Sequence, residues 1–387
     1  MAVAVTRTDY LPRVDPRSRT ELVRLSPDRK RVAFVRTIGW VASVCVTPIR
    51  ERSPSTEEDD WRALVDEDTM DSEPPEAEDL LELTRPEGGP IVDLDWSPDG
   101  TYLGYRLAGA PPGIDDEIGW VRSDEPGEVG RCPGTAFSWA PTRPVLYVAD
   151  PGQYVLRRVA ADGDRRQDLA ELIHYRNPRF WPQVEACPDG RRVAFTTRDE
   201  RDETTRVWLV EPGDDGPQTS LVTWIPGVDL HAYLVWSTKG VSLALHVVHE
   251  QQRRSGLIVL KQMRGEGKIW YQHEALDGPA PPAWAPDGRS FSLFRRNRDS
   301  LGSEGPDDAA ALAADPYDPK TIPTGAPGQL LSRHALVRLD LATGHLDELA
   351  PAGALQGTPR YLDDERLLVD GGRAAHVLRL ELVADDE

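Results

Sequence analysis

The stretch Val92–Leu107, VDLDWSPDGTYLGYRL, contains the pattern from which the fold of this chain follows. Within it, Trp96-Ser-Pro-Asp-Gly100 has the composition of a tight turn, because proline presets φ at one central position and glycine accepts a positive φ. The residues from Thr101 to Leu107 then alternate between two sides with the two-residue period of a β-strand. The stretch therefore predicts a strand, a Pro-Asp-Gly turn and a second strand.

The same unit occurs seven times along the chain. Aligned on the first residue of the turn, here called the anchor, the copies are Leu25-Ser-Pro-Asp-Arg29, Trp96-Ser-Pro-Asp-Gly100, Trp139-Ala-Pro-Thr-Arg143, Ala186-Cys-Pro-Asp-Gly190, Trp236-Ser-Thr-Lys-Gly240, Trp284-Ala-Pro-Asp-Gly288 and the degenerate Tyr361-Leu-Asp-Asp-Glu365. Four of the six gaps between anchors measure 43 to 50 residues, close to the roughly 40–50 residues of a four-stranded propeller blade. We therefore predict an all-β fold, a seven-bladed β-propeller of four-stranded antiparallel blades.

An apolar strand follows every copy of the turn. The predicted second strands are 31–35, 102–107, 145–149, 192–196, 241–247, 290–294 and 366–369. The last unit ends with Ala375–Val383, which has the pattern of a third strand, so its outermost strand is missing at the C-terminus. We predict that Ala2–Thr6 supplies that strand, because pairing the two ends of the chain removes an exposed sheet edge.

The repeat pattern, Trp-Ser/Ala-Pro-Asp-Gly followed by an apolar strand, resembles the WD-like propeller repeat of TolB. It also resembles the propeller domains of the prolyl oligopeptidase and dipeptidyl peptidase group, over about residues 20 to 383. The resemblance implies a fold and leaves the activity open, because propellers host many functions. The peptidase activity of that group is not implied, since the chain has no Gly-x-Ser-x-Gly nucleophile elbow and no room for a hydrolase domain.

The two long gaps between anchors each contain an insertion, so we expect a single propeller domain over residues 1–387 with insertions at 50–79 and 299–332. From Glu51 to Glu82 there are 14 acidic and 2 basic residues, which favours a solvated, disordered loop. The alternative is an acidic tether anchored by its few apolar residues, Trp61, Leu64 and Val65. Residues 299–332 are rich in Gly, Pro, Ala and Asp, and are interpreted as a disordered loop or as a cover or partner-binding arm.

Composition excludes several classes of function. The formal net charge of −20 argues against a nucleic-acid partner, which requires a basic footprint. No apolar window is long enough to cross a membrane, and the first twenty residues lack the apolar core of a secretory signal. Cys45, Cys132 and Cys187 are odd in number and widely spaced, as expected for unpaired thiols in a reducing compartment. We therefore expect a cytoplasmic protein, unlike TolB, which is periplasmic.

The sequence contains no recognisable catalytic or cofactor motif. A phosphate-binding Gly-Lys-Ser/Thr loop, a dinucleotide fingerprint and a zinc-type cysteine spacing are all missing, so we expect no cofactor, no metal and no assignable catalytic residue. His246 and His249 stand three apart on a predicted strand and point to opposite faces. The alternative function is an enzyme of the lyase or hydrolase type with a small-molecule or peptide site in the central channel. For that alternative, His174 or His231 could act as the base.

The main hypothesis is a non-catalytic scaffold or sensor that binds a protein or peptide partner, alone or as a subunit of a larger bacterial complex. Aromatic residues and arginine dominate binding hot spots. The connection before the fourth unit carries such residues, and the second strand of the sixth unit runs into a cluster of arginines. The candidate partner-binding residues are Tyr175, Arg179, Trp181, Arg295, Arg296 and Arg298. The oligomeric state is left open.

Overall fold

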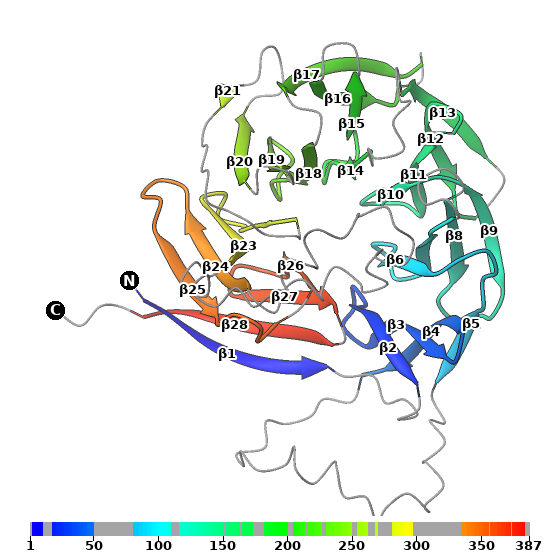
Figure 1. The fold of residues 1–387 in the computed structure, drawn as a ribbon, viewed down its shortest axis with the longest axis horizontal. Helices are drawn as coiled ribbons and strands as arrows, with labels where there is room; N and C mark the ends of the chain where they lie inside the picture. The colour runs from blue at the N-terminus through cyan, green and yellow to red at the C-terminus, as the bar shows by residue number, and fades with distance from the viewer. Residues whose placement is uncertain are drawn as a thin grey trace, which may run out of the picture.

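A computed structural model of the chain shows seven four-stranded antiparallel sheets arranged in a ring (Figure 1). The structure describes residues 2–10, 18–49, 80–109, 116–150, 152–162, 165–172, 182–199, 204–213, 216–226, 230–249, 254–261, 268–269, 281–296, 334–355, 357–372 and 374–383. The predicted seven-bladed β-propeller is confirmed. Both insertions, 50–79 and 299–332, lie outside the described residues.

Each blade is a meander whose strands follow one another from the centre of the ring outward. Blade 1 contains β2 (Arg19–Leu25), β3 (Arg31–Ile38), β4 (Val41–Pro48) and β5 (Leu81–Thr84). Blade 2 contains β6 (Ile91–Trp96), β7 (Tyr102–Leu107), β8 (Glu117–Arg122) and β9 (Glu128–Pro133). Blade 3 contains β10 (Ala136–Trp139), β11 (Val145–Asp150), β12 (Val155–Ala160) and β13 (Arg166–Glu171). Blade 4 contains β14 (Val184–Ala186), β15 (Val193–Asp199), β16 (Thr204–Glu211) and β17 (Gln218–Pro226).

The other three blades follow the same plan. Blade 5 contains β18 (Leu230–Trp236), β19 (Ser242–His249), β20 (Arg254–Lys261) and β21 (Lys268–Ile269). Blade 6 contains β22 (Ala283–Trp284), β23 (Ser290–Arg296), β24 (His334–Asp340) and β25 (Leu346–Ala350). Blade 7 contains β26 (Gly357–Tyr361), β27 (Arg366–Gly371), β28 (Ala375–Val383) and, as its outermost strand, β1 (Ala2–Tyr10).

The ring is closed by the first strand of the chain, as predicted. β1 pairs antiparallel with β28, in a register that runs from Ala2 opposite Val383 to Tyr10 opposite Ala375. The strand is longer than the predicted Ala2–Thr6 and adds an ionic contact, with Asp9 Oδ1 lying 2.8 Å from His376 Nδ1. Blade 7 therefore consists of strands from both ends of the chain.

The Pro-Asp-Gly turns have the geometry that their composition predicts. In blade 2, the Gly100 N–H donates to the Ser97 carbonyl at 2.8 Å, and Gly100 has a φ of 71°. The Asp99 carboxylate accepts hydrogen bonds from the Ser97 hydroxyl at 2.6 Å and from the Thr101 N–H at 3.0 Å. The turn aspartate of blade 1 makes equivalent contacts, and Asp287 of blade 6 accepts hydrogen bonds from the Arg289 N–H and from the Ser290 hydroxyl. These aspartates therefore hold the turn conformation.

Three of the four anchor tryptophans, those of units 2, 3 and 5, form a hydrogen bond to an earlier blade. The indole N–H of Trp96 donates to the Arg24 carbonyl at 3.0 Å, that of Trp139 to the Asp95 carbonyl at 3.4 Å, and that of Trp236 to the Glu185 carbonyl at 3.1 Å. In every case the acceptor directly precedes the anchor of the previous unit. The recurrence at equivalent positions means that the inner strands of neighbouring blades run side by side in the same direction.

The core consists of apolar layers between neighbouring blades. One cluster joins Ala33, Val35 and Val44 of blade 1 to Leu94, Trp96 and Leu103 of blade 2, all of them buried. Fully burying one leucine contributes about 1.5–3 kcal/mol. Cys45, Cys132 and Cys187 are unpaired, as predicted, and buried in these layers. Burial raises the pKa of Cys132 to about 11 and that of Cys45 and Cys187 to about 12.

The outermost strand carries one extra, bulged residue in five blades. The inserted residues are Leu83, Val129, Leu169, Val222 and Leu349. Four of these five side chains are buried, and Val129 is the exposed member. A bulge changes the direction of the side chain at the point of insertion. In four of these blades the inserted apolar side chain is buried at the outer edge of the ring.

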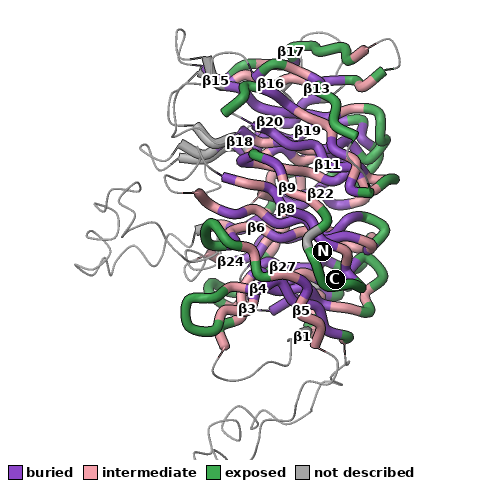
Figure 2. The backbone as a smooth tube through the Cα atoms, turned by 90° about the vertical axis from the view of Figure 1, so that its right-hand side faces the viewer, coloured by how far each residue is buried: buried purple, intermediate pink, exposed green. Residues whose placement is uncertain are grey.

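The ring has two distinct faces, seen edge-on in Figure 2. Because strands alternate in direction within a blade, the Pro-Asp-Gly turns lie on one face, the turn face. The connections between second and third strands lie on the other, which we call the hairpin face; residues 39–40 and 152–154 are examples. Within the described part of the chain, no helix has the length and apolar character needed to span a membrane.

Candidate functional site

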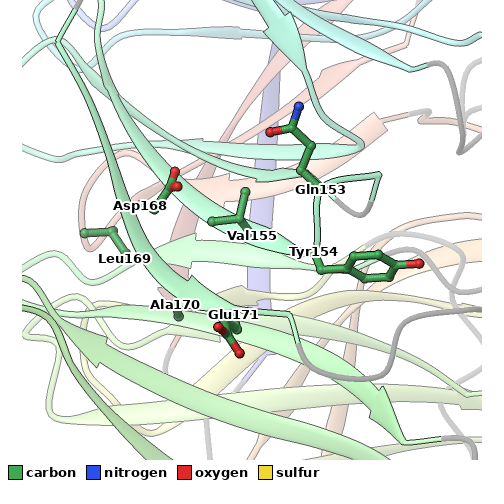
Figure 3. A pocket seen from close by; sticks show the side chains of 7 residues that line it. All are labelled: Gln153, Tyr154, Val155, Asp168, Leu169, Ala170 and Glu171. Atoms are coloured by element: carbon green, nitrogen blue, oxygen red, sulfur yellow. The ribbon is translucent and has the colours of Figure 1, made fainter.

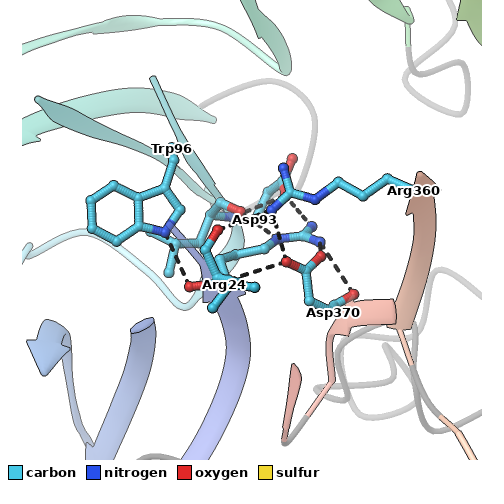
Figure 4. Close-up of polar contacts among 7 residues, drawn as sticks. Arg24, Asp93, Trp96, Arg360 and Asp370 are labelled. Carbon is cyan, nitrogen blue, oxygen red and sulfur yellow. Dashed lines mark hydrogen bonds and ion pairs between the residues drawn. The ribbon is translucent and has the colours of Figure 1, made fainter. Parts of the chain in front are cut away.

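Charged side chains from several blades meet at the centre of the ring. Asp370 of β27 is almost completely buried and accepts hydrogen bonds from Arg24 Nη1 at 2.9 Å and from Arg360 Nη2 at 3.0 Å. The second oxygen of Asp370 also accepts the Leu25 N–H at 3.2 Å. Arg24 in turn donates to the Leu94 carbonyl at 2.8 Å (Figure 4). One carboxylate and two arginines therefore tie blades 7, 1 and 2 together.

Two more carboxyl groups project from an inner strand beside this network. Asp93 and Asp95 lie on β6, and Asp93 Oδ1 is 3.7 Å from Arg24 Nη2. Burial alone would lower the pKa of Arg24. The carboxylates of Asp370, Asp93 and Asp95 outweigh this effect, so the pKa of Arg24 is raised. Burial raises the pKa of Asp95 in spite of the nearby arginines. At the centre of the ring, Asp370 pairs with two arginines, and the carboxyl groups outnumber the guanidinium groups.

Glu185 on β14 carries a carboxyl group whose pKa is strongly raised. Burial, with a smaller contribution from Asp95, raises its pKa from 4.5 to about 8. Among the described residues, no donor or cation lies within bonding distance of its carboxyl group. Because Asp95 acts on Glu185 although blade 3 stands between their blades, the two carboxyl groups face the centre of the ring. At neutral pH, Glu185 is protonated and can donate a hydrogen bond.

The raised pKa of Glu185 predicts an unusual pH dependence of stability. The folded protein holds this proton more tightly than the unfolded chain, so stability is fully present below about pH 4.5 and is lost as the pH rises to about 8. The slope is about 1.4 kcal/mol per pH unit within this window. Glu185→Gln mimics the protonated form and is expected to remove that slope, which denaturant unfolding between pH 5 and 8 measures.

The control for this prediction is Glu125→Gln, which changes an exposed carboxylate in the same way. Glu125→Gln is expected to retain the wild-type slope. Wild type and Glu185→Gln should have equal stability near pH 4.5 and should diverge at pH 8, with the variant the more stable. Parallel curves for wild type and Glu185→Gln would show that this carboxyl group is ionised at neutral pH.

Two buried histidines have described contacts outside this central cluster. The ring of His246 is buried in blade 5, with its centroid 5.8 Å from that of Tyr233. His376 contacts Asp9 at the closure of blade 7. Of the two histidines considered as a catalytic base, His174 lies outside the described residues, and His231 is described in its backbone alone, on β18. The central cluster described here is therefore built from carboxyl and guanidinium groups.

Exposed aromatic side chains mark the hairpin face. The β3–β4 hairpin carries Ile38, Trp40 and Val41 at its tip, with 48%, 102% and 51% of their surfaces exposed. Tyr154, in the β11–β12 connection, is also exposed and has a φ of 55°, the left-handed region that a tyrosine rarely adopts. Two hairpins on one face therefore present aromatic side chains to solvent.

A hollow of about 460 Å³ opens beside Tyr154 at the rim of blade 3 (Figure 3). Its lining residues are Gln153, Tyr154, Val155, Asp168, Leu169, Ala170 and Glu171. Arg157 organises the lining by contacting Asp168 at 2.8 Å and Gln153 Oε1 at 2.9 Å. Glu171 ends β13, and residues 173–181, in the connection that follows, lie outside the described residues.

Most of the predicted partner-binding residues fall outside the described part of the chain. These are Tyr175, Arg179, Trp181 and Arg298. Arg295 and Arg296 lie near the end of β23, opposite Ala335 and His334 of β24. Arg295 is partly buried, and the side chain of Arg296 is not among those described. The assignment of these six residues to a partner site remains a prediction.

Sequence reasoning missed the central cluster, although the repeat contained a signal for it. Arg24, Asp95, Glu185 and Arg360 all occupy one position, directly before the anchors of units 1, 2, 4 and 7. The same position is Ser138, Val235 and Ala283 in the other three units. Alignment of the seven units therefore places four ionisable residues at one equivalent position. In the folded ring, the inner strands bring these residues toward the centre.

Comparison with known proteins finds structures of similar fold but no related sequence of known function. No protein-family model and no curated protein sequence matches the chain. Prolyl oligopeptidase B from Galerina marginata, bound to a 25mer macrocyclization substrate, matches with a TM-score of 0.53 and 10% identity, over 91% of this chain and 46% of that one. A chain of the mitotic checkpoint complex matches with a TM-score of 0.52 and 12% identity, over 98% and 95%.

The likeness is one of fold. It confirms the predicted resemblance to prolyl oligopeptidase and WD-repeat propellers. This chain spans less than half of the oligopeptidase. At these identities, neither match carries an activity, a substrate or a partner over to this protein.

Proposed function

We propose that this protein is a non-catalytic, cytoplasmic propeller that binds a protein or peptide partner on its hairpin face. The observation that carries the proposal is the tip of the β3–β4 hairpin, where Trp40 is completely exposed between exposed Ile38 and Val41. A tryptophan in this position contributes nothing to the core, and tryptophan is the residue most enriched at binding hot spots. Contiguous apolar groups on a surface mark interaction sites.

Other features of the hairpin face support the same proposal. Tyr154 adds a second exposed aromatic ring, held in a backbone conformation that costs on the order of 1–3 kcal/mol and is common at functional sites. β23 ends and β24 begins at this face, where Arg296 pairs with His334. We also assign to this surface, as a prediction from the sequence, the residues Tyr175, Arg179, Trp181, Arg295, Arg296 and Arg298.

The test is affinity capture of tagged protein from its source cells, comparing wild type with Trp40→Ala. Loss of a hot-spot tryptophan costs about 2 kcal/mol or more, so partner recovery at limiting concentration is expected to fall roughly 30-fold. A variant lacking residues 300–330 tests the contribution of the second insertion in the same experiment. The matched control is Val241→Ala, which truncates an exposed apolar residue on the turn face.

The proposal predicts a partner that wild type and Val241→Ala retain equally and that Trp40→Ala loses. Equal recovery by Trp40→Ala would remove the hairpin tip from the interaction. Failure of both wild type and control to retain any partner would overturn the proposal. Melting temperatures of the variants distinguish lost binding from lost folding, since truncation of an exposed side chain is expected to change stability by less than about 0.5 kcal/mol.

The alternative, an enzyme with its site in the central channel, is favoured by Glu185 alone. A carboxylic acid with a pKa of about 8 is suited to donate a proton at neutral pH. Asp95, which acts on Glu185, is itself influenced by the guanidinium groups of Arg24 and Arg360. Small-molecule screening by thermal shift, with Glu185→Gln as the comparison, tests whether a ligand occupies the centre of the ring.

A further inference from the structure

The hollow at the rim of blade 3 is lined by two segments that the sheet holds together. Residues 153–155 come from the β11–β12 connection and the start of β12, and residues 168–171 form the end of β13. The Leu172 N–H donates to the Tyr154 carbonyl at 2.7 Å, which joins the two segments at the hairpin face. The volume of about 460 Å³ lies within the range of about 300–1,000 Å³ that is typical of ligand sites.

The lining of this hollow is acidic. Among the described lining residues, Asp168 and Glu171 carry carboxyl groups and none is basic. Arg157, which is not part of the lining, lies 2.8 Å from Asp168 Oδ1 and 3.3 Å from Asp150 Oδ2, so one guanidinium group faces two carboxylates. Within the described part of the chain, the Glu171 carboxylate has no hydrogen bond or ion pair. The hollow therefore offers a cation a carboxylate for which no described side chain competes.

Tyr154 adds an aromatic ring to the same lining. Its side chain is 47% exposed and has no hydrogen bond or ring contact among the described residues, and Figure 3 shows the ring extending from the connection. The backbone φ of 55° is one that glycine adopts without strain and tyrosine rarely adopts. A strained residue whose side chain the fold does not use points to a function of that side chain. The face of an aromatic ring attracts cations.

We propose that this hollow binds an arginine side chain in a basic segment of the partner protein. A guanidinium group stacks on an aromatic face and donates two parallel hydrogen bonds to a carboxylate, and Tyr154 and Glu171 supply these two groups. The formal net charge of −20 attracts a basic segment to this protein over a longer range. The inference rests on the proposed function, since it names the chemistry of the partner that the hairpin face binds.

The test is a titration of the full-length protein into a fluorescein-labelled peptide that carries one arginine between glycine and serine residues. Fluorescence anisotropy reports binding at about 0.15 M salt, where long-range attraction is screened. The same peptide with glutamine in place of arginine is expected to bind about 10-fold more weakly, because it lacks the charge-assisted hydrogen bonds. Equal affinity of these two peptides overturns the proposal. Equal affinity of a lysine peptide overturns the assignment to arginine, since an ammonium group has no planar fork.

Two variants test whether the peptide occupies the hollow. Glu171→Gln is expected to weaken binding of the arginine peptide roughly 10-fold. The matched control is Glu211→Gln, which changes an exposed glutamate at the end of β16 in the same way and is expected to bind as wild type does. Tyr154→Gly removes the ring and relieves the backbone strain, so about threefold weaker binding is expected without a lower melting temperature.

An affinity that Glu171→Gln and Tyr154→Gly both leave unchanged, or that Glu211→Gln lowers equally, overturns the proposal. If Tyr154→Gly fails to fold, Tyr154→Asn replaces it, because asparagine tolerates the same backbone conformation.

Capture from the source cells separates this inference from the proposed function. A partner that wild type and Glu171→Gln retain equally leaves the proposed function standing and overturns the arginine site. Binding of the arginine peptide in the hollow, with no partner captured from the source cells, supports the site and overturns the proposed function as stated.

Discussion

Asp370→Ala is expected to lower the free energy of unfolding by about 3–5 kcal/mol, because it leaves two arginines without their buried partner. Asp370 has 1% of its side chain exposed and contacts Arg24, Arg360 and the Leu25 N–H. For a chain of 387 residues this loss corresponds to roughly 4–6 °C in melting temperature. Denaturant unfolding of wild type and variant measures it.

The control for Asp370 is Asp124→Ala, which removes an ion pair of similar length at the surface. Asp124 lies 3.0 Å from Arg122, and both side chains are largely exposed. Exposed pairs contribute about 0–1 kcal/mol, so this variant is expected to resemble wild type. A similar loss in the two variants would mean that the central network contributes no more than a surface ion pair.

Deletion of residues 1–10 is expected to destabilise the ring by on the order of 5 kcal/mol, because it removes the backbone pairing of β1 with β28. Nine residue pairs hold this closure, and Val5 packs against the cluster that contains Leu378 and Leu380. The deletion also leaves β28 as an open nine-residue edge, so aggregation is expected on heating. Melting temperature and light scattering measure the two effects.

Complementation separates closure of the ring from an unspecific loss of residues. A synthetic peptide of residues 1–10, added to the truncated protein, is expected to restore most of the melting temperature. The control variant Arg7→Ala keeps the strand and removes its contacts to Asp9 and His376, so a smaller loss is expected. Wild-type stability of the truncated protein would exclude β1 as the closing strand.

The repeat made the fold predictable because it is local. A Pro-Asp-Gly turn and the apolar strand after it depend on residues within about ten positions of one another. The predicted second strand 102–107 matches β7, and 31–35 lies within β3, which continues to Ile38. The later end of β3 reflects pairing with β4 up to the hairpin tip, which no local pattern encodes.

The candidate sites were less predictable than the fold. The two insertions and the aromatic connection were recognised from composition, but their composition does not say what they contact. Trp40 is an ordinary residue of a strand pattern in the sequence, and its exposure follows from its place at a hairpin tip.

The order of strands, the seven turns and the closure by the N-terminal strand follow from the sequence alone, since each rests on a short pattern or on counting strands. The meeting of Arg24, Asp95, Glu185 and Arg360 was decided by the tertiary structure. These residues stand up to 336 positions apart, and only closure of the ring brings their strands to one centre. The raised pKa of Glu185 arises from that enclosure, because desolvation depends on every group that surrounds the carboxyl.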